Sequence, residues 1–234
     1  MVAVPVVAAA VLWQGANTHT AGWFGHQISH GARDGNEVAL TFDDGPNATA
    51  TVPILDVLDA RGAKGTFFVV GRAVASRPDL ARLIVARGHL VGNHSWRHDS
   101  KGWLDPRYPE LARTQRTVEA ELGVCPAFYR APHGQHTPLL ARVVHGHGLT
   151  MIGWDVSAGD WKARDPRHLA DRIVAKARGG SIIDLHDGLD GRVDADRAVL
   201  VAALPRILDG LARKGLETVR LDDLIGRPAY LVGC

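Results

Sequence analysis

Short apolar runs alternate with helical segments along most of the chain, and this alternation is the feature that most restricts its fold. Seven runs of three to five residues are rich in Val, Ile, Leu and Phe. They are 38–42, 66–70, 90–92, 127–130, 150–154, 181–185 and 216–220. Largely continuous apolar runs of this length are typical of strands that are covered on both faces, as in parallel sheets.

Six segments with helical spacing of apolar residues separate these runs. They are 50–61, 78–87, 109–122, 138–145, 166–178 and 195–214. Most begin at or near proline and end at glycine just before the next run, which matches the preferences of helix starts and stops. Repeated strand–helix units predict a single α/β domain, either a complete or incomplete (β/α) barrel or, as the alternative, an open doubly wound sheet. No glycine-rich phosphate loop follows any run, which disfavours a nucleotide-binding fold.

Charge and cysteine content exclude some classes of function. Lys plus Arg number 27 against 25 Asp plus Glu, so the net charge of +2 gives no concentrated basic surface and no argument for a nucleic-acid partner. Twelve histidines hint at metal or proton chemistry. Cys125 and Cys234 are too few for a zinc knuckle or a disulfide framework. They could pair, but one lies mid-chain and the other is the last residue, so we expect two free thiols, with Cys125 packed and Cys234 mobile.

The first thirteen residues carry no charge and are mostly Val and Ala. This stretch is shorter than the roughly 20 residues of a spanning helix and lacks a basic leader. We expect it to be the trailing part of an export signal or membrane anchor, with a buried N-terminal strand or helix as the alternative. The expected organisation is a leader and linker over 1–36, a barrel over 37–226 and a tail over 227–234. The protein is then secreted or associated with the cell envelope, or cytoplasmic if the apolar stretch is not a signal.

Polar residues at the ends of the apolar runs are the candidates for chemistry. Asp43 and Asp44 follow the first run, and two adjacent carboxylates are costly unless a cation or a proton relieves them. A turn with two solvated Asp residues is the alternative. His94 and His98, four residues apart after the third run, would share one face of a helical turn and can share a metal. Either Asp would complete three protein ligands and leave an open coordination position, the arrangement of catalytic metal sites.

Three further run ends carry residues of the same kind. Arg130 follows the fourth run and could hold one of the carboxylates by a bidentate contact. Asp160 and Trp161 follow the fifth, and His186 at the sixth is a candidate general acid with an orienting carboxylate nearby. Each alone is more often structural. Because strand ends meet at one face of a barrel, their coincidence indicates an active site.

Five motifs stand in this order along the chain, namely T-F-D-D-G-P, H-S-W-R-H, R-A-P-H-G, D-W and L-H-D. Together they resemble the polysaccharide deacetylases with a NodB homology domain, carbohydrate esterase family 4, from residue 38 to about residue 225. The resemblance implies a distorted (β/α) barrel of about seven parallel strands. It also implies a divalent metal, zinc or cobalt, and hydrolysis of N-acetyl or O-acetyl groups on sugars.

The resemblance implies a role for each matching residue. The catalytic set is the metal ligands Asp44, His94 and His98, the general base Asp43, the base-orienting Arg130, the general acid His186 and the acid-orienting Asp160. The backbone N–H of His133 would hold the oxyanion together with the metal. The remaining pocket residues are Pro132, Trp161, Asp184 and Leu185.

Two positions depart from the family pattern. Ser157 stands where the fourth motif usually has its first Asp, and Asp184 stands where the family has a Leu that lines the acyl pocket. Asp184 would share a face of its strand with His186. We expect it either to help Asp160 orient His186 or to make the acyl pocket polar, which would favour a formyl or hydrogen-bonding acyl group over acetyl.

The function expected from the resemblance is metal-dependent removal of an acyl group, most simply acetyl, from an amino-sugar glycan or glycolipid. Chitin oligomers and peptidoglycan are the representative substrates. Hydrolysis of a small cyclic or linear amide is the alternative within the fold. A glycan-binding pseudoenzyme without turnover is the alternative of another class.

Overall fold

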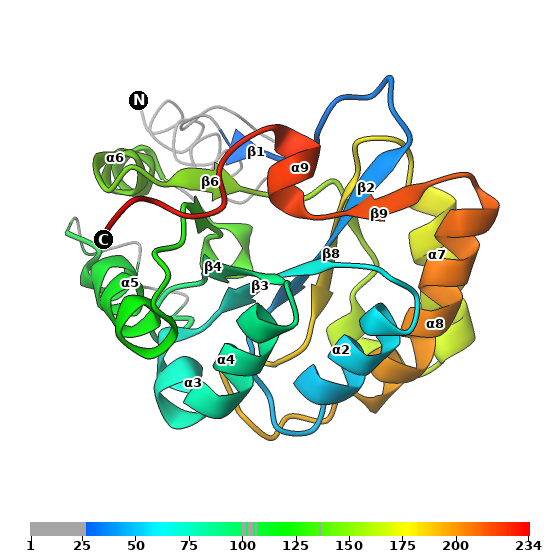
Figure 1. The fold of residues 1–234 in the computed structure, drawn as a ribbon, viewed down its shortest axis with the longest axis horizontal. Helices are drawn as coiled ribbons and strands as arrows, with labels where there is room; N and C mark the ends of the chain where they lie inside the picture. Colours follow the sequence, from blue (N-terminus) through cyan, green and yellow to red (C-terminus); the bar gives the residue numbers. More distant parts are fainter. Residues whose placement is uncertain (1–26, 100–101, 103–104, 106, 136) are drawn as a thin grey trace, which may run out of the picture.

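A computed structural model describes residues 27–99, 102, 105, 107–135 and 137–234 (Figure 1). The apolar N-terminal stretch, and the expectation that it is an export signal or anchor, lie outside the described residues. Within the described part of the chain, no helix is both long enough and apolar enough to cross a bilayer.

The strands are all paired in parallel in one sheet, whose order is β1-β6-β5-β4-β3-β2-β8-β7, with β9 beside β2. They are β1 (Gln27–Ile28), β2 (Glu37–Asp43), β3 (Gly65–Val69), β4 (Leu90–Asn93), β5 (Phe128–Tyr129), β6 (Thr150–Ile152), β7 (Val156–Ser157), β8 (Ile182–His186) and β9 (Glu217–Val219). The sheet is curled (Figure 1), and among the described residues β1 and β7 pair on one side only, so the barrel is incomplete. The expected distorted barrel is confirmed.

Helices follow most strands and surround the curled sheet (Figure 1). They are α2 (Thr51–Asp59), α3 (Gly71–Ser76), α4 (Pro78–Ala86), α5 (Pro109–Leu122), α6 (Pro138–Gly146), α7 (Pro166–Lys176), α8 (Ala198–Arg213) and α9 (Leu221–Ile225), with 3₁₀ turns η3 (Pro132–Gly134) and η4 (Asp160–Lys162). All seven expected strands and six expected helices have a counterpart. Strands β1 and β7 were not expected, because these two-residue strands, unlike the equally short β5, do not lie within a longer apolar run.

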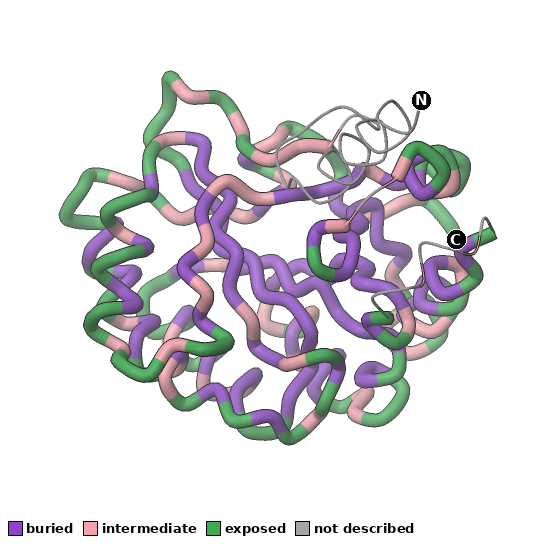
Figure 2. The backbone as a smooth tube through the Cα atoms, turned by 180° about the vertical axis from the view of Figure 1, so that it is seen from behind, coloured by how far each residue is buried: buried purple, intermediate pink, exposed green. Residues whose placement is uncertain are grey.

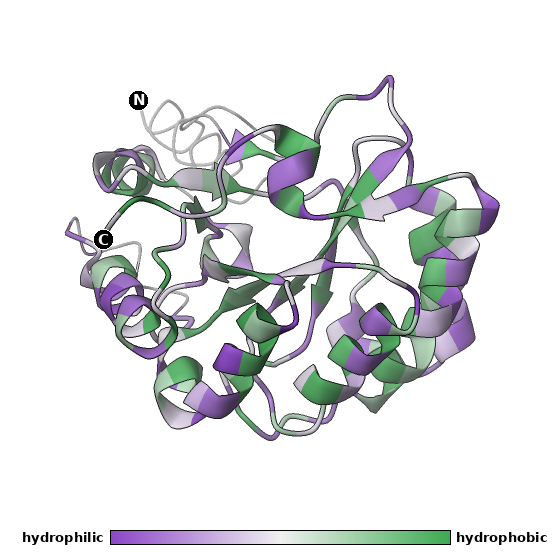
Figure 3. Cartoon of the chain, viewed as in Figure 1, coloured by the Kyte–Doolittle hydropathy of each residue, from purple (hydrophilic) through white to green (hydrophobic). Residues whose placement is uncertain are grey.

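Alternate residues of each strand pack into two different parts of the core, one between the sheet and the helices and one inside the barrel. Leu40, Phe42 and Leu185 belong to a cluster beneath α2, α7 and α8, where Phe42 stacks on Phe67 with ring centroids 4.8 Å apart. Residues of the other face fill the interior of the barrel, and α9 covers its base through Leu221. The buried strands lie at the centre of the fold, and the helices turn their polar residues outward (Figures 2 and 3). The carboxyl ends of the strands open into a cavity lined largely by polar residues.

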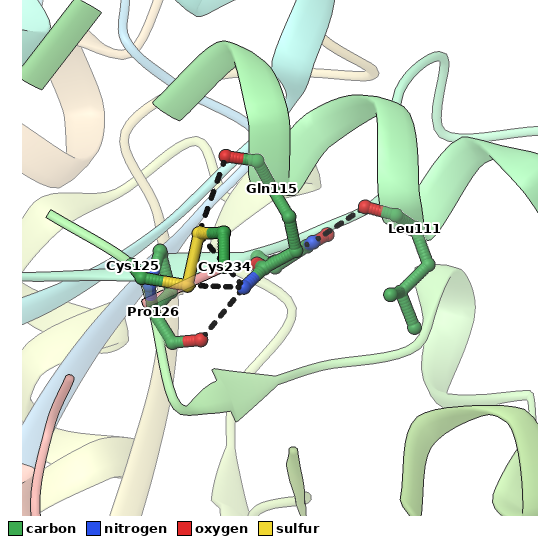
Figure 4. The surroundings of a disulfide bond; sticks show 6 residues. Leu111, Gln115, Cys125, Pro126 and Cys234 are labelled. Atoms are coloured by element: carbon green, nitrogen blue, oxygen red, sulfur yellow. Dashed lines mark hydrogen bonds between the residues drawn. A yellow bond between two sulfur atoms is a disulfide. The ribbon is translucent and has the colours of Figure 1, made fainter. Parts of the chain in front are cut away.

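A disulfide joins Cys125 to Cys234, so the expectation of two free thiols is wrong (Figure 4). Their separation of 109 positions in the sequence says nothing about their distance in space. The C-terminal segment turns back along the chain before β5, where Ala127 N donates to Ala229 O and Leu231 N donates to Cys125 O, each at 2.8 Å. Gln115 of α5 donates to Pro126 O at 2.9 Å beside the bond. Residues 227–234, expected as a tail, are held against the barrel.

Candidate active site

Most of the predicted site residues gather around a cavity of about 510 Å³ at the carboxyl ends of the strands. The lining consists of Asp43, Asp44, His94, His98, His133, Trp154, Ser157, Trp161, Asp184, His186, Leu189 and Asp190. The other two predicted polar residues, Arg130 and Asp160, are buried directly behind this lining. Chemistry in barrels of this kind is carried by strand ends, and the cavity lies there.

Asp44, His94 and His98 form a compact group of metal-ligand type, with one donor atom of each within 4.8 Å of the others. Asp44 Oδ1 lies 3.4 Å from His94 Nε2 and 3.2 Å from His98 Nε2. This oxygen is buried and, among the described residues, accepts no hydrogen bond. A buried carboxylate oxygen facing two imidazole nitrogens fits a zinc or cobalt ion, because both metals take this donor set.

The two histidines reach this position without the helical turn that their spacing suggested. Residues 94–98 form an irregular loop in which Ser95 and His98 have positive φ angles of 66° and 58°. Hydrogen bonds within the loop hold this conformation, since Asn93 Oδ1 accepts from Ser95 N at 2.9 Å and Ser95 Oγ accepts from His98 N at 3.1 Å. The predicted pairing of the histidines is found, although the predicted geometry is wrong.

The outer ring nitrogens of both histidines have carbonyl or carboxylate neighbours. His94 Nδ1 is 2.8 Å from Arg130 O, a contact that leaves Nε2 facing Asp44. His98 Nδ1 is 3.1 Å from Asp190 Oδ1, although the contact is not aligned as a hydrogen bond. Asp190 N also donates to Asp44 Oδ2 at 2.9 Å. One residue of the loop after β8 therefore touches two members of the group, in the way that outer partners orient metal ligands.

Burial and mutual charge set the ionisation of this group in the metal-free protein. Burial, together with the neighbouring His94, lowers the pKa of His98 to about 4, so His98 is neutral near pH 7. Burial opposes ionisation of Asp44, but His94 and His98 outweigh it and hold its pKa below the ordinary value. Neutral His98 and ionised Asp44 are in the forms that bind a divalent cation. Burial opposes protonation of His94, but Asp43 and Asp44 outweigh it and raise its pKa, so a cation bound here would displace a proton from that ring.

Asp43, the expected base, is buried beside this group and held by Arg130. The Arg130 side chain is fully buried, and its Nη1 donates to Asp43 Oδ1 at 2.8 Å and to Thr41 Oγ1 at 2.8 Å. Its Nη2 donates to Gly153 O at 3.0 Å, so the contact with Asp43 is not the bidentate one that the sequence suggested. Arg130 thus fixes the position of one oxygen of Asp43.

His186, the expected acid, stands across the cavity at the end of β8. Its Nδ1 lies 2.9 Å from Asp160 Oδ1, and its backbone N–H donates to Asp160 Oδ2 at 3.0 Å. Burial opposes protonation of His186, but Asp160 and Asp184 outweigh it and hold its pKa well above the ordinary value. The ring therefore remains protonated near neutral pH and carries a proton that it can donate.

Arg197 supports the acid and was missed by the sequence reasoning. Its Nη2 donates to Asp160 Oδ2 at 2.6 Å and its Nε donates to His186 O at 3.0 Å. It lies eleven positions beyond His186, outside any strand end, so no local pattern marked it. Leu189 and Asp190, in the same connection, were missed as lining residues for the same reason. Trp154 was also missed, although it ends the expected run 150–154.

The expected pocket residues divide into those that reach the cavity and those that do not. His133 and Trp161 line it, and Trp161 is 45% exposed with its ring centroid 4.9 Å from that of His186. Leu185 points to the helix side of β8 within the apolar core, so its assignment to the pocket is corrected. Pro132 is buried and does not belong to the lining.

Asp184 lies in the lining and is only 2% exposed. Its Oδ1 is 3.4 Å from Arg130 Nη1, which it shares with Asp43. Burial raises the pKa of Asp184 to about 7, because little solvent reaches its charged form. The structure thus pairs Asp184 with the arginine that holds the base.

A curled parallel sheet with a buried aspartate held by arginine, a histidine held by aspartate and a group of metal-ligand type at its strand ends is the arrangement of an α/β-barrel enzyme. The profile of the family described as polysaccharide deacetylase matches residues 30–152, more than half of the chain. The chain belongs to this family.

Two curated relatives support the assignment. The chain is 34% identical over 196 residues to a chitooligosaccharide deacetylase of a Bradyrhizobium species, covering 80% of this chain and 90% of the relative. It is also 34% identical over 197 residues to the peptidoglycan-N-acetylglucosamine deacetylase PgdA of Listeria monocytogenes, covering 83% of this chain. The alignment spans only 40% of the length of that relative.

A solved structure shares both fold and sequence. The family 4 acetyl xylan esterase of Clostridium thermocellum, determined with a cobalt ion, superposes with a TM-score of 0.74 at 33% identity. The match covers 83% of this chain and 94% of that chain. The fold expected from the sequence is thereby confirmed at the level of the family.

Proposed function

We propose that the chain hydrolyses an N-linked acyl group on an amino sugar of a glycan, of the peptidoglycan or chitin-oligomer kind, with a divalent metal held by Asp44, His94 and His98. The observation that carries this proposal is Asp44 Oδ1, which accepts no hydrogen bond from the described residues and faces two imidazole nitrogens, beside one buried carboxylate and one protonated histidine. The names of the curated relatives support the substrate class.

The bound metal supplies Lewis acidity, which polarises the acyl carbonyl and lowers the pKa of a water molecule. Asp43 accepts the proton of the attacking water, with Arg130 fixing the direction of its carboxylate. His186, held by Asp160, donates a proton to the departing nitrogen. Without that proton the amine is a poor leaving group, so both residues are needed for amide cleavage.

The rim of the cavity supports binding of a sugar ring. Trp161 is 45% exposed and stands directly beside His186, so an aromatic face is available next to the proton donor. The face of an aromatic ring can pack against the C–H groups of a sugar, and the polar edge of the indole can still contact water or a hydroxyl. The backbone N–H of His133 keeps its proposed role at the oxyanion, and zinc is the metal that we propose, with cobalt as a substitute.

The two alternatives receive less support from the site. A binding module needs neither a held base nor a protonated acid, and this site has both. A small-amide hydrolase would not need the exposed Trp161 at the rim. The disulfide supports an oxidising location outside the cytoplasm, in agreement with the proposed envelope or secreted setting.

The test is release of acetate from N-acetylated glucosamine oligomers and peptidoglycan fragments by protein stripped with a chelator and reloaded with zinc or cobalt. We expect release that depends on the added metal and stops again with chelator. Full activity in the stripped protein, or stoichiometric metal without release from any acylated glycan, would contradict the proposal.

A further inference from the structure

The inner face of the barrel is layered, and the register of three strands fixes which residues share a layer. Asp43 of β2 lies opposite His186 of β8. Thr41 of β2 lies opposite Asp184, which in turn lies opposite Ser157 of β7. Because alternate residues share one face, the backbone of this second layer lies two residues, or about 6.6 Å, deeper along the strands. The Asp184 side chain reaches upward from it, with one carboxylate oxygen within 4.8 Å of donor atoms of Asp43 and His186. Asp184 and Ser157 therefore form a polar floor beneath the reacting layer.

The orientation of a substrate amide in the cavity follows from the groups that lie outward and inward of the reacting layer. The cleaved bond must lie at the level of Asp43 and His186, since these groups exchange protons with it. The sugar side must continue outward past the exposed Trp161 because the glycan extends into solvent. The acyl substituent, the smaller side, then points inward to Trp154, Ser157 and Asp184.

Asp184 brings an unused hydrogen-bond acceptor to this floor. Its Oδ1 faces Arg130 at 3.4 Å, while Oδ2 accepts no hydrogen bond from any described residue. The Ser157 side chain likewise makes no hydrogen bond within the described part of the chain, although its backbone oxygen accepts from Lys176. A methyl group against this floor would displace water and leave the carboxylate oxygen without a donor, which is unfavourable.

We propose that Asp184 selects an acyl group that carries a hydroxyl on the carbon next to the carbonyl, so that the preferred substrate is an N-hydroxyacetyl amino sugar rather than its N-acetyl analogue. The proposal rests on the proposed acyl-amide hydrolysis and specifies its substrate. Water adds its hydroxyl to the acyl carbon, the C–N bond breaks, and the nitrogen takes the proton. The products are hydroxyacetate and the free amino sugar.

The experiment compares kcat/KM of the zinc-loaded chain on glucosamine oligomers that carry N-hydroxyacetyl, N-acetyl or N-formyl groups. One missing hydrogen bond to a buried carboxylate corresponds to a preference of roughly 10- to 100-fold for hydroxyacetyl over acetyl. Asp184→Leu should reverse this preference and raise activity on the N-acetyl oligomer relative to the parent. Asp194→Leu, on the exposed loop after β8, is the matched control and should leave all three ratios unchanged.

Metal content and thermal unfolding of each variant are measured alongside the kinetics. If Asp184→Leu does not fold, Asp184→Asn is used in its place. We expect Asp184→Asn to reduce the preference for hydroxyacetyl over acetyl several-fold. A wild-type preference for acetyl or formyl, or a hydroxyacetyl preference unchanged in Asp184→Asn, would overturn the proposal while metal-dependent acyl release still supports the proposed function. Absence of metal-dependent release of any of the three acyl groups would overturn both.

Discussion

Removing the disulfide should destabilise the fold without disturbing the active site. The bond closes a loop with a sequence separation of 109 residues. In the chain-entropy relation, a loop of that length corresponds to about 4.8 kcal/mol at 25 °C, and removal of native disulfides typically costs roughly 2–5 kcal/mol. The backbone hydrogen bonds of Ala229 and Leu231 remain in a reduced protein. We therefore expect the double variant Cys125→Ser/Cys234→Ser to lose roughly 2–5 kcal/mol of unfolding free energy.

The assay is urea unfolding followed by tryptophan fluorescence, for the oxidised wild type, the reduced wild type and the double variant. The last two should share one midpoint, below that of the oxidised protein. Neither cysteine lines the cavity, so zinc affinity of the folded double variant should stay within about twofold of the wild type. Equal midpoints for oxidised and reduced protein would refute the reasoning, because the C-terminal segment would then not be tied to the barrel.

Three further predictions concern the site itself. His186→Ala should reduce cleavage of an N-acetyl substrate more than that of a nitrophenyl ester, since a phenolate leaves with less help than an amine, and equal losses would contradict proton donation. Asp190→Gly, which tolerates the positive φ of 51°, should weaken zinc binding roughly 10- to 100-fold in competition with a chelating dye, whereas Asp194→Gly should not. Burial raises the pKa of Asp184 to about 7 from 3.8, so folded metal-free protein binds more protons than unfolded protein between these values and this residue costs stability as pH rises. Relative to the wild type, Asp184→Asn should gain up to about 4 kcal/mol of unfolding free energy between pH 4 and pH 8, and no relative gain in urea titrations would contradict the assigned burial.

The repeated units of the barrel were predictable because each one combines two independent signals. An apolar run such as 181–185 predicts a covered strand, and a proline start with a glycine stop brackets the helix before it. Strands β1 and β7 were not predicted because neither lies within a longer apolar run, as the equally short β5 does, and their pairing is decided by the neighbouring strands. The disulfide was not predicted because the pairing of two cysteines depends on their distance in space.

The site was predictable where a residue stands at a strand end and unpredictable where a loop supplies it. Asp43, His186 and Arg130 were identified with their partners, because parallel strand ends must meet. Arg197 and Asp190 belong to the long connection after β8, whose path is set by tertiary contacts. Leu185 was misplaced because a motif names residues without regard to the face of the strand on which each one lies.

The central claim is that Asp44, His94 and His98 hold a metal that works with Asp43 as the base. The most direct test measures bound zinc and acetate release together in the wild type, His98→Ala and Asp43→Asn. We predict one zinc and full release in the wild type, and loss of both in His98→Ala. We predict retained zinc with release lowered roughly 10²- to 10⁴-fold in Asp43→Asn. Stoichiometric zinc in His98→Ala, or undiminished release from Asp43→Asn, would contradict the account.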